Sequence, residues 1–248
     1  MDLPAPRPDW ALFFDIDGTL IELASAPNAV SVPPALRQDL AALHGSLGAV
    51  ALISGRSLHS IDALFNPLVL PASGQHGAEA RIEGETLVIP PLPALRDIVT
   101  PLQQFAAHHP GILVEDKGNS VAIHYRMAPT LADQVAAVTR SLVAGCTELE
   151  ALASKMAVDI KPRAISKGGA VAWFMAQPPF ATRVPVFVGD DRTDEAGFVT
   201  VNQRGGLSIR VGERSESAAH YSLDSPAAVR EWIAGLARYY SWSGVCSD

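Results

Sequence analysis

The stretch Ala11-Leu-Phe-Phe-Asp-Ile-Asp-Gly-Thr-Leu20 decides the fold. An unbroken apolar run ends at Phe14, and the aspartates Asp15 and Asp17 follow it directly. Unbroken apolar runs are typical of parallel strands that are buried on both faces of a sheet. In an open α/β sheet, ligands bind beyond the carboxyl ends of such strands. The stretch therefore predicts a buried strand with two carboxylates at the rim of a site, where Gly18 lets the chain turn sharply.

The same alternation of apolar runs and helical patterns continues on both sides of the middle of the chain. Further apolar runs lie at 49–53, 184–188 and 207–211, and helical patterns lie at 33–47, 57–64, 193–199 and 225–239. This order predicts an α/β fold with a parallel sheet and right-handed crossovers.

The middle of the chain reads as a separate α/β unit. Prolines mark both of its ends, in Pro90-Pro-Leu-Pro93 and at Pro162. Between them, the patterns predict helices at 95–108 and 130–143 and strands at 112–115, 120–125, 148–153 and 156–160. We expect an inserted domain at 93–162, joined by a double hinge to a core that is formed by 1–92 and 163–248.

A second acidic segment, Val188-Gly-Asp-Asp-Arg-Thr-Asp-Glu195, also follows a buried run. Its four acidic groups repel one another unless a cation neutralises them. Oxygen ligands suit a hard divalent cation, and Mg2+ fits best because it keeps several waters and needs few protein ligands. The alternative is an acidic helix start, which the helix macrodipole favours. That alternative explains Asp194 and Glu195 better than Asp190 and Asp191, which lie at the strand exit.

Two more polar side chains lie at predicted element ends. Ser54, in Leu52-Ile-Ser-Gly-Arg56, could bond a phosphate oxygen, or it could cap the next helix. Lys167 stands at the start of a helix, where the macrodipole disfavours a cation, so a bound anion would explain its position. The sequence has neither a Walker A motif nor a Gly-x-Gly-x-x-Gly after a strand, which argues against a P-loop kinase and a dinucleotide enzyme.

The amino-acid composition excludes further classes of protein. The chain has 248 residues, of which 48% are hydrophobic, so a disordered chain is excluded. Its formal net charge of -7 argues against non-specific nucleic-acid binding, which depends on Lys and Arg. Cys146 and Cys246 are far apart and lack metal-site spacing, so we expect two reduced thiols. We see no secretory signal and no membrane-spanning stretch, and we therefore expect a cytoplasmic protein without membrane or nucleic-acid partners.

Taken together, the motifs resemble those of the haloacid dehalogenase (HAD) superfamily of phosphohydrolases, and within it the trehalose-6-phosphate phosphatase family. The resemblance lies in Leu52-Ile-Ser-Gly-Arg56, Gly74-Gln-His-Gly-Ala-Glu79, Val114-Glu-Asp-Lys-Gly118 with Ile123-His-Tyr-Arg126, and Gly189-Asp-Asp-Arg-Thr-Asp-Glu195. The third of these discriminates best, because it lies in the insert and not in the shared core. The resemblance implies a Rossmann-like parallel-sheet HAD core with an inserted α/β cap domain that grips a disaccharide.

The resemblance also implies what each motif residue does. Asp15 would be the nucleophile and Asp17 the general acid and base, while Ser54 and Lys167 would hold the phosphoryl oxygens. Mg2+ would be bound by Asp15, the backbone carbonyl of Asp17, and Asp190, with Asp191 or Asp194 behind. The sugar would be bound by Arg56, Glu115, Lys117, Arg126, Lys155 and Asp159. The family more often has Glu at the position of Asp159, so this side chain has a shorter reach. No chemical task is evident for His76, and we expect a loop histidine that bonds to backbone.

The implied reaction is the Mg2+-dependent hydrolysis of trehalose 6-phosphate through an aspartyl phosphate. Two alternatives stay open. One is a phosphatase of the same fold for another sugar phosphate, such as sucrose phosphate. The other is a non-catalytic sugar-phosphate sensor or a regulatory subunit of a synthase. The second alternative predicts loss of the nucleophile or its acid, yet both Asp15 and Asp17 are present.

Overall fold

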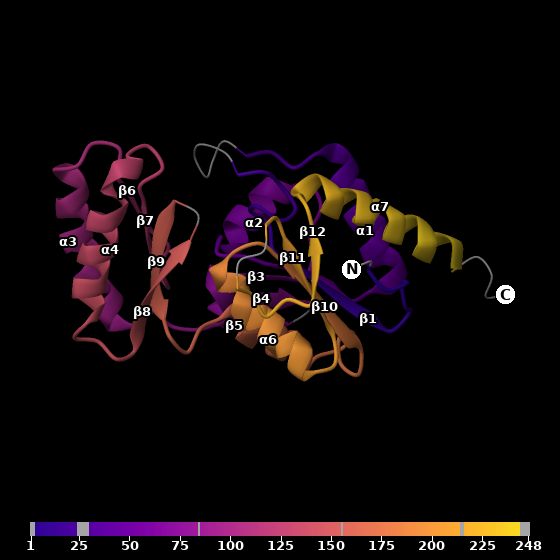
Figure 1. The fold of residues 1–248 in the computed structure, drawn as a ribbon. Helices are drawn as coiled ribbons and strands as arrows, with labels where there is room; N and C mark the ends of the chain where they lie inside the picture. The colour runs from indigo at the N-terminus through magenta and orange to yellow at the C-terminus, as the bar shows by residue number, and fades with distance from the viewer. Residues whose placement is uncertain (1–2, 24–29, 84, 155, 214–215, 244–248) are drawn as a thin grey trace.

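Two β-sheets organise the molecule, and they lie side by side in Figure 1. The structure is a computed structural model that describes residues 3–23, 30–83, 85–154, 156–213 and 216–243. Within these ranges no helix is both long and apolar enough to cross a membrane. Cys146 is a free, half-buried thiol, and Cys246 lies outside the described residues.

The larger sheet has eight strands among the described residues, in the order β12-β11-β10-β1-β2-β3-β4-β5. The strands are β1 (Trp10–Phe14), β2 (Val50–Ile53), β3 (Ala72–Gly74), β4 (Glu79–Ile82), β5 (Glu85–Val88), β10 (Val184–Gly189), β11 (Leu207–Val211) and β12 (Tyr221–Leu223). All neighbours from β12 to β3 are parallel, and β4 and β5 extend the sheet in antiparallel fashion. The predicted parallel α/β sheet is therefore confirmed.

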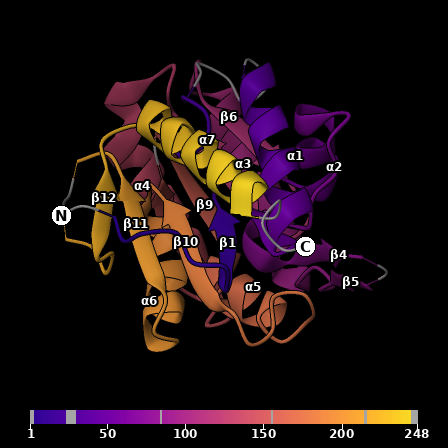
Figure 2. The same ribbon diagram turned by 90° about the vertical axis from the view of Figure 1, so that its right-hand side faces the viewer.

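Helices cover both faces of this sheet, which explains the unbroken apolar run in β1. They are α1 (Pro34–Leu47), α2 (Leu58–Phe65), α5 (Lys167–Phe174), α6 (Glu195–Gln203) and α7 (Pro226–Ser243). Trp10, Leu12 and Phe14 pack with the cluster that contains α1, α2 and α7, whereas Ala11 and Phe13 pack with α5 and α6 on the opposite face. Figure 2 shows α1 and α7 together on one face and α5 and α6 on the other. A strand buried on both sides needs apolar side chains at every position.

The smaller sheet comes entirely from the middle of the chain. It has the order β6-β7-β9-β8, and all its described neighbours are antiparallel. Its elements are α3 (Pro93–Ala107), β6 (Leu113–Asp116), β7 (Val121–His124), α4 (Ala132–Val143), β8 (Leu149–Ser154) and β9 (Ala157–Pro162). Side chains alternate here too: Val158 and Ile160 of β9 pack into an apolar cluster with α3 and α4, while Asp159 between them lines a cavity on the other face. We propose that the segment 93–162, called the cap below, is a domain of its own.

Most predicted elements are present, with ends that differ by a few residues. The last helix is the clearest case, because it is predicted at 225–239 and observed at Pro226–Ser243. Short 3-10 helices also occur, namely η2 (Gln75–Gly77), η3 (Pro129–Leu131) and η4 (Arg192–Asp194). The strands β3, β4, β5 and β12 were not predicted, since strands of three or four residues are too short to show a clear period.

Candidate active site

Three neighbouring parallel strands end at the same place and carry the first polar groups of the site. Asp15 follows β1, Ser54 follows β2, and Asp190 follows β10. The Asp15 N–H donates to the carbonyl of Val188 at 2.9 Å, which keeps the ends of β1 and β10 together. All three polar residues line one cavity of about 500 Å³. The strand-end prediction for these three residues is therefore confirmed in its geometry.

Gly18 allows the loop after β1 to fold onto Asp190. Its φ of +82° lies in the left-handed region that favours glycine, and a Cβ at this position would lie 2.2 Å from Asp190 Oδ2. Beside it, the buried hydroxyl of Thr19 donates to Asp190 Oδ1 at 3.2 Å. The Asp-Gly-Thr motif thus supports the carboxylate of a strand that is far away in the sequence.

Lys167 joins two aspartates in the buried part of the site. It is the first residue of α5, where the Ser166 side chain caps the helix by accepting from Gly169 N at 3.0 Å. Its Nζ lies 2.7 Å from Asp15 Oδ1 and 2.7 Å from Asp194 Oδ1. Burial alone would lower the pKa of Lys167, but the two carboxylates hold it well above its usual value. A fixed positive charge therefore stands beside Asp15.

One lysine does not balance the negative charge around Asp15. Burial raises the pKa of Asp15 to about 7, and the charges of Asp190 and Asp191 add to this effect, although Lys167 opposes it. Oxygen atoms of Asp15, Asp190 and Asp194 all lie within 4.8 Å of one another. Such a group of buried carboxylate oxygens is suited to a hard divalent cation.

Asp191 and Asp194, which follow Asp190, accept hydrogen bonds from groups close to it in the chain. Asp194 Oδ2 accepts from the N–H groups of Asp190 and Asp191 at 2.9 and 3.0 Å. Asp191 is the N-cap of η4 and accepts from Thr193 N at 2.8 Å and from Thr193 Oγ1 at 2.7 Å. The helix-start explanation thus applies to Asp191 as well as to Asp194, contrary to the expectation for Asp191. Asp190 keeps its position at the strand exit, on the cavity wall.

Arg56 holds Asp17 in a two-pronged ion pair. Arg56 Nε donates to Asp17 Oδ2 at 2.6 Å, and Arg56 Nη2 donates to Asp17 Oδ1 at 2.7 Å. Ser54 does not cap α2, because Ser57 is the N-cap and accepts from Ser60 N at 3.2 Å. Ser54 Oγ instead accepts from Arg56 N at 3.2 Å and lines the cavity. The capping alternative for Ser54 is therefore wrong.

The cap contributes a second group of charged side chains to the same cavity. His124 on β7 lies 3.0 Å from Glu115 of β6, measured between Nε2 and Oε2. Lys117 Nζ lies 3.8 Å from Glu115 and 3.6 Å from Asp159. The hydrogen bond with His124 lowers the pKa of Glu115 despite partial burial. Burial would raise the pKa of Asp159, but the charge of Lys117 helps to hold it far below its usual range. Both carboxylates are therefore ionised acceptors.

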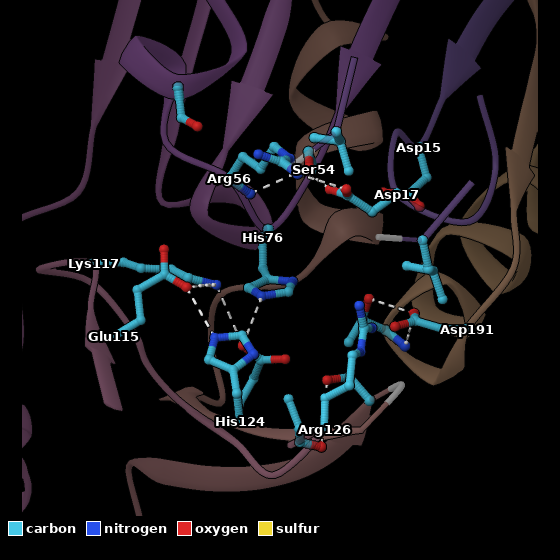
Figure 3. A pocket seen from close by; sticks show the side chains of 18 of the residues that line it. Asp15, Asp17, Ser54, Arg56, His76, Glu115, Lys117, His124, Arg126 and Asp191 are labelled. Atoms are coloured by element: carbon cyan, nitrogen blue, oxygen red, sulfur yellow. Dashed lines mark hydrogen bonds and ion pairs between the residues drawn. The ribbon is translucent and has the colours of Figure 1, made fainter. Parts of the chain in front are cut away.

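Figure 3 shows how these groups face one another. Ser54, Arg56 and Asp17 lie on one side of the cavity, Glu115, Lys117 and His124 lie on another, and His76 lies between them. The cavity lining includes the predicted residues Asp15, Asp17, Ser54, Arg56, Glu115, Lys117, Arg126, Asp159, Lys167, Asp190 and Asp191. Asp194 is fully buried behind them, and Lys155 lies outside the described residues.

Sequence reasoning missed Thr19 and His124, although both belong to motifs that it singled out. His124 lies within Ile123-His-Tyr-Arg126. His124 lies on β7, which pairs with β6, and the alternation of side chains places it on the same face of the cap sheet as Glu115. The strand pairing could have pointed to His124, but only if the register of the two strands had been known.

Solved structures share this fold. A phosphatase of the HAD superfamily from Bacteroides thetaiotaomicron matches with a TM-score of 0.62 and 17% identity, over 96% of this chain and 98% of the other. The C-terminal domain of trehalose-6-phosphate phosphatase from Candida albicans matches with a TM-score of 0.86 and 22% identity, over 93% and 92% of the two chains. The fold is that of the HAD-superfamily phosphatases.

Sequence comparison narrows the class to a family. Residues 13–227 match the family model described as trehalose-phosphatase. The trehalose-6-phosphate phosphatase of Escherichia coli K12 is 40% identical over 245 residues, which cover 97% of this chain and 88% of the relative. The chain belongs to the trehalose-phosphatase family, which consists of phosphoric monoester hydrolases.

Proposed function

We propose that this chain hydrolyses trehalose 6-phosphate to trehalose and phosphate with Mg2+ as its cofactor. The observation that carries the proposal is one cavity with two kinds of wall: Asp15 and Lys167 on the core side, and Glu115 and Lys117 on the cap side. The first pair suits a phosphoryl group and the second suits sugar hydroxyls. The cavity volume of about 500 Å³ is in the usual range for a small-molecule site. The substrate named for the E. coli relative supports this choice.

The residues present fit a magnesium ion. The candidate ligands are carboxylate oxygens only, and they converge from β1 and β10. We assign Asp15 and Asp190 as direct ligands, together with the backbone carbonyl of Asp17. Asp194 has both oxygens engaged by Lys167 and by backbone N–H groups, so it supports the site from behind, with Asp191 beside it. When bound, Mg2+ would offset the repulsion between the phosphate and Asp15.

The reaction that we propose has two steps. Asp15 attacks phosphorus in line, so a bond from its carboxylate oxygen to phosphorus forms while the bond to the sugar oxygen breaks. Asp17 gives its proton to that leaving oxygen. Asp17 then takes a proton from the water that hydrolyses the aspartyl phosphate and regenerates Asp15. Ser54 and Lys167 hold the phosphoryl oxygens, since catalysis of phosphoryl transfer is mostly positioning and charge stabilisation.

Sugar recognition is assigned to Arg56 and to the cap. Arg56 pairs with Asp17 in the structure and lines the same cavity as the cap residues. Glu115, Lys117 and Arg126 line the cap side, and Asp159 lies behind Lys117.

We also propose a cytoplasmic location, which the low cysteine content favours.

A substrate panel tests this function. Phosphate release is measured with trehalose 6-phosphate, sucrose 6-phosphate, glucose 6-phosphate and nitrophenyl phosphate, each with Mg2+ and with a chelator. We expect the highest kcat/KM for trehalose 6-phosphate and no turnover with the chelator. A preference for sucrose 6-phosphate would overturn the substrate, and no release from any ester would favour a sugar-phosphate sensor.

A further inference from the structure

His76 lies where the core side of the cavity meets the cap side, and the reaction above gives it no task. It belongs to η2, directly after β3, and the residue is only 4% exposed. The backbone φ is +60° at His76 and +49° at Gln75. Residues other than glycine rarely adopt this left-handed backbone conformation. Such strain persists only where the surroundings hold it, and it is concentrated at functional sites.

The core holds this turn firmly. The His76 N–H donates to the carbonyl of Ser54 at 2.9 Å. At Gly77 a Cβ would lie 2.7 Å from the carbonyl oxygen of Ser166, so the turn packs against the residue that precedes Lys167. The turn thus packs against the backbone of Ser54 and against the residue next to Lys167.

The cap holds the same turn from the other side. Gln75 Oε1 accepts from Asn119 N at 2.9 Å, and Asn119 lies in the loop between β6 and β7. The Asn119 side chain in turn donates to the carbonyl of Ile89 at 2.9 Å. The imidazole of His76 is therefore placed by contacts with both walls of the cavity.

Within the part of the chain that the structure describes, the His76 imidazole makes no hydrogen bond to protein. It lies over Gly55, where a Cβ would come within 2.7 Å of Cε1 and Nε2. Neither ring nitrogen has a hydrogen-bond partner among the residues that the structure describes. The nearest carboxylate oxygen, Asp159 Oδ1, is 3.8 Å from Nε2, which is beyond hydrogen-bond distance. The expected bond from this loop histidine to backbone is made by its N–H to the carbonyl of Ser54, and its ring makes none to the described residues.

An unpaired buried imidazole costs free energy, so its position calls for an explanation. Burial lowers the pKa of His76, although Asp159 opposes this effect. The ring is therefore neutral, with one nitrogen that donates and one that accepts. A sugar hydroxyl can bond with either nitrogen, whereas a phosphate oxygen can use only the donor.

We propose that His76 is a substrate-binding residue whose ring hydrogen-bonds a sugar hydroxyl close to the phosphate ester. The ring lines the cavity between Asp15, on the core side, and Lys117, on the cap side, as Figure 3 shows. This inference rests on the proposed sugar-phosphate function. It adds a residue that determines substrate specificity on the core side of the cavity. The family resemblance implied no such task for the segment Gly74–Glu79 that contains His76.

Two variants test it, His76→Gly and His76→Asn, because both residues tolerate a left-handed turn. The measurement is kcat/KM for trehalose 6-phosphate and for nitrophenyl phosphate, which lacks sugar hydroxyls. We expect His76→Gly to lose roughly tenfold on the sugar phosphate, as for one neutral hydrogen bond. Turnover of the nitrophenyl ester should fall much less. His76→Asn should lose less, since its amide keeps a donor and an acceptor. His108→Ala, an exposed histidine at the end of α3, is the control.

A spectroscopic readout does not depend on turnover. In the Asp15→Asn protein, the imidazole ¹⁵N resonances of His76 should shift when trehalose 6-phosphate is added, and those of His108 should not. The inference would be overturned if His76→Gly kept the wild-type preference for the sugar phosphate, or if it lost the same factor on both esters. It would also be overturned if the His76 resonances did not shift. If the wild type prefers another sugar phosphate, the same ratio is taken with that substrate, so a wrong substrate and a wrong task for His76 give different results.

Discussion

At the scale of single residues, the core of the site is a chain of buried charges. Asp15 and Asp194 flank Lys167 at 2.7 Å each, and Asp17 is held by Arg56. These charges are arranged before any substrate binds. Because each carboxylate has a different set of partners, the residues should respond differently to substitution.

Asp15→Asn should abolish phosphate release. Asparagine keeps the shape of the side chain but is a much weaker nucleophile and a neutral metal ligand. Circular dichroism should show an unchanged fold. The measurement is single-turnover phosphate release, and the matched control is Asp9→Asn, an exposed carboxylate just before β1. Substantial turnover by Asp15→Asn would contradict the nucleophile assignment.

Asp17→Asn should be severely impaired on sugar phosphates and less so on nitrophenyl phosphate. General acid–base catalysis contributes about 10²–10⁴-fold, and it matters most for a leaving group that needs a proton. A nitrophenolate needs none. The test compares kcat for the two esters in this variant. The same loss on both would argue against proton transfer to the leaving oxygen.

At the scale of elements, alternation along the strands of the cap decides which side chains reach the substrate. Leu113, Glu115 and Lys117 point the same way along and just beyond β6, and they line the cavity. Apolar residues on the opposite face of the cap sheet pack against α3 and α4. The groups that we propose to bind the sugar can therefore be changed without disturbing the core of the cap.

Glu115→Ala, Lys117→Ala and Arg126→Ala should each lose roughly 10–10²-fold in kcat/KM for trehalose 6-phosphate, since a hydrogen bond to a charged group contributes about 1.5–3 kcal/mol. The slow hydrolysis of nitrophenyl phosphate should stay nearly unchanged, because that ester is too small to need the cap. Steady-state kinetics on both esters check this expectation. Parallel loss of the two activities would mean that these residues support the fold instead.

An ion pair that joins α2 to β4 gives a prediction for stability against pH. Arg81 donates two hydrogen bonds to Asp62 at 2.8 and 2.7 Å, and this lowers the pKa of Asp62. A carboxyl whose pKa is lower in the folded state stabilises the fold above its unfolded pKa, and that contribution is lost as pH falls through the folded value. Because Asp62 is 37% exposed, Asp62→Asn should cost only about 0.5 kcal/mol at pH 7.

The pH dependence distinguishes this ion pair from a packing effect. Chemical denaturation of the wild type and of Asp62→Asn should give midpoints that differ at pH 7, and the difference should shrink as the pH falls below the ordinary pKa of aspartate and the wild-type carboxyl becomes protonated. Asp97→Asn, on α3, is a control for the loss of a single carboxylate. A difference in midpoint that persists unchanged at pH 3 would contradict the electrostatic explanation.

At the scale of the whole molecule, the proposed metal site joins segments that are far apart in the chain. Asp15 follows β1 and Asp190 follows β10, which pair directly in the sheet. A ligand that binds both would stabilise the folded chain, because the unfolded chain does not hold these carboxylates together.

Mg2+ should therefore raise the melting temperature. Binding at a concentration 100-fold above Kd contributes about 2.7 kcal/mol, which corresponds to roughly 5–10 °C for a chain of this size. Thermal melts with Mg2+ and with a chelator measure the shift. Asp190→Asn should lose most of it, whereas Asp97→Asn should keep it. An equal shift in the wild type and in Asp190→Asn would place the ion elsewhere.

Much of the core site could be predicted, because its residues follow local patterns. Asp15, Ser54 and Asp190 each come directly after an apolar run, and Lys167 begins a helix where the sequence indicates one. The functions of Asp191 and Ser54 were harder to predict, since capping depends on where η4 and α2 begin, within one or two residues. The strands β3, β4, β5 and β12 escaped prediction because strands of three or four residues are too short to show a clear period.

The sequence by itself determined the α/β class, the strand-end positions of Asp15, Ser54 and Asp190, and the cap as a second α/β unit. Those features follow from apolar patterns over neighbouring residues. Only the tertiary structure decided that Lys167 bridges Asp15 and Asp194 and that Arg56 holds Asp17. It also decided that the ring of His76 lies between the two walls of the cavity without a hydrogen bond to any described residue. These are contacts between groups far apart in the chain, and their distances depend on how the strands and helices pack, which no local pattern encodes.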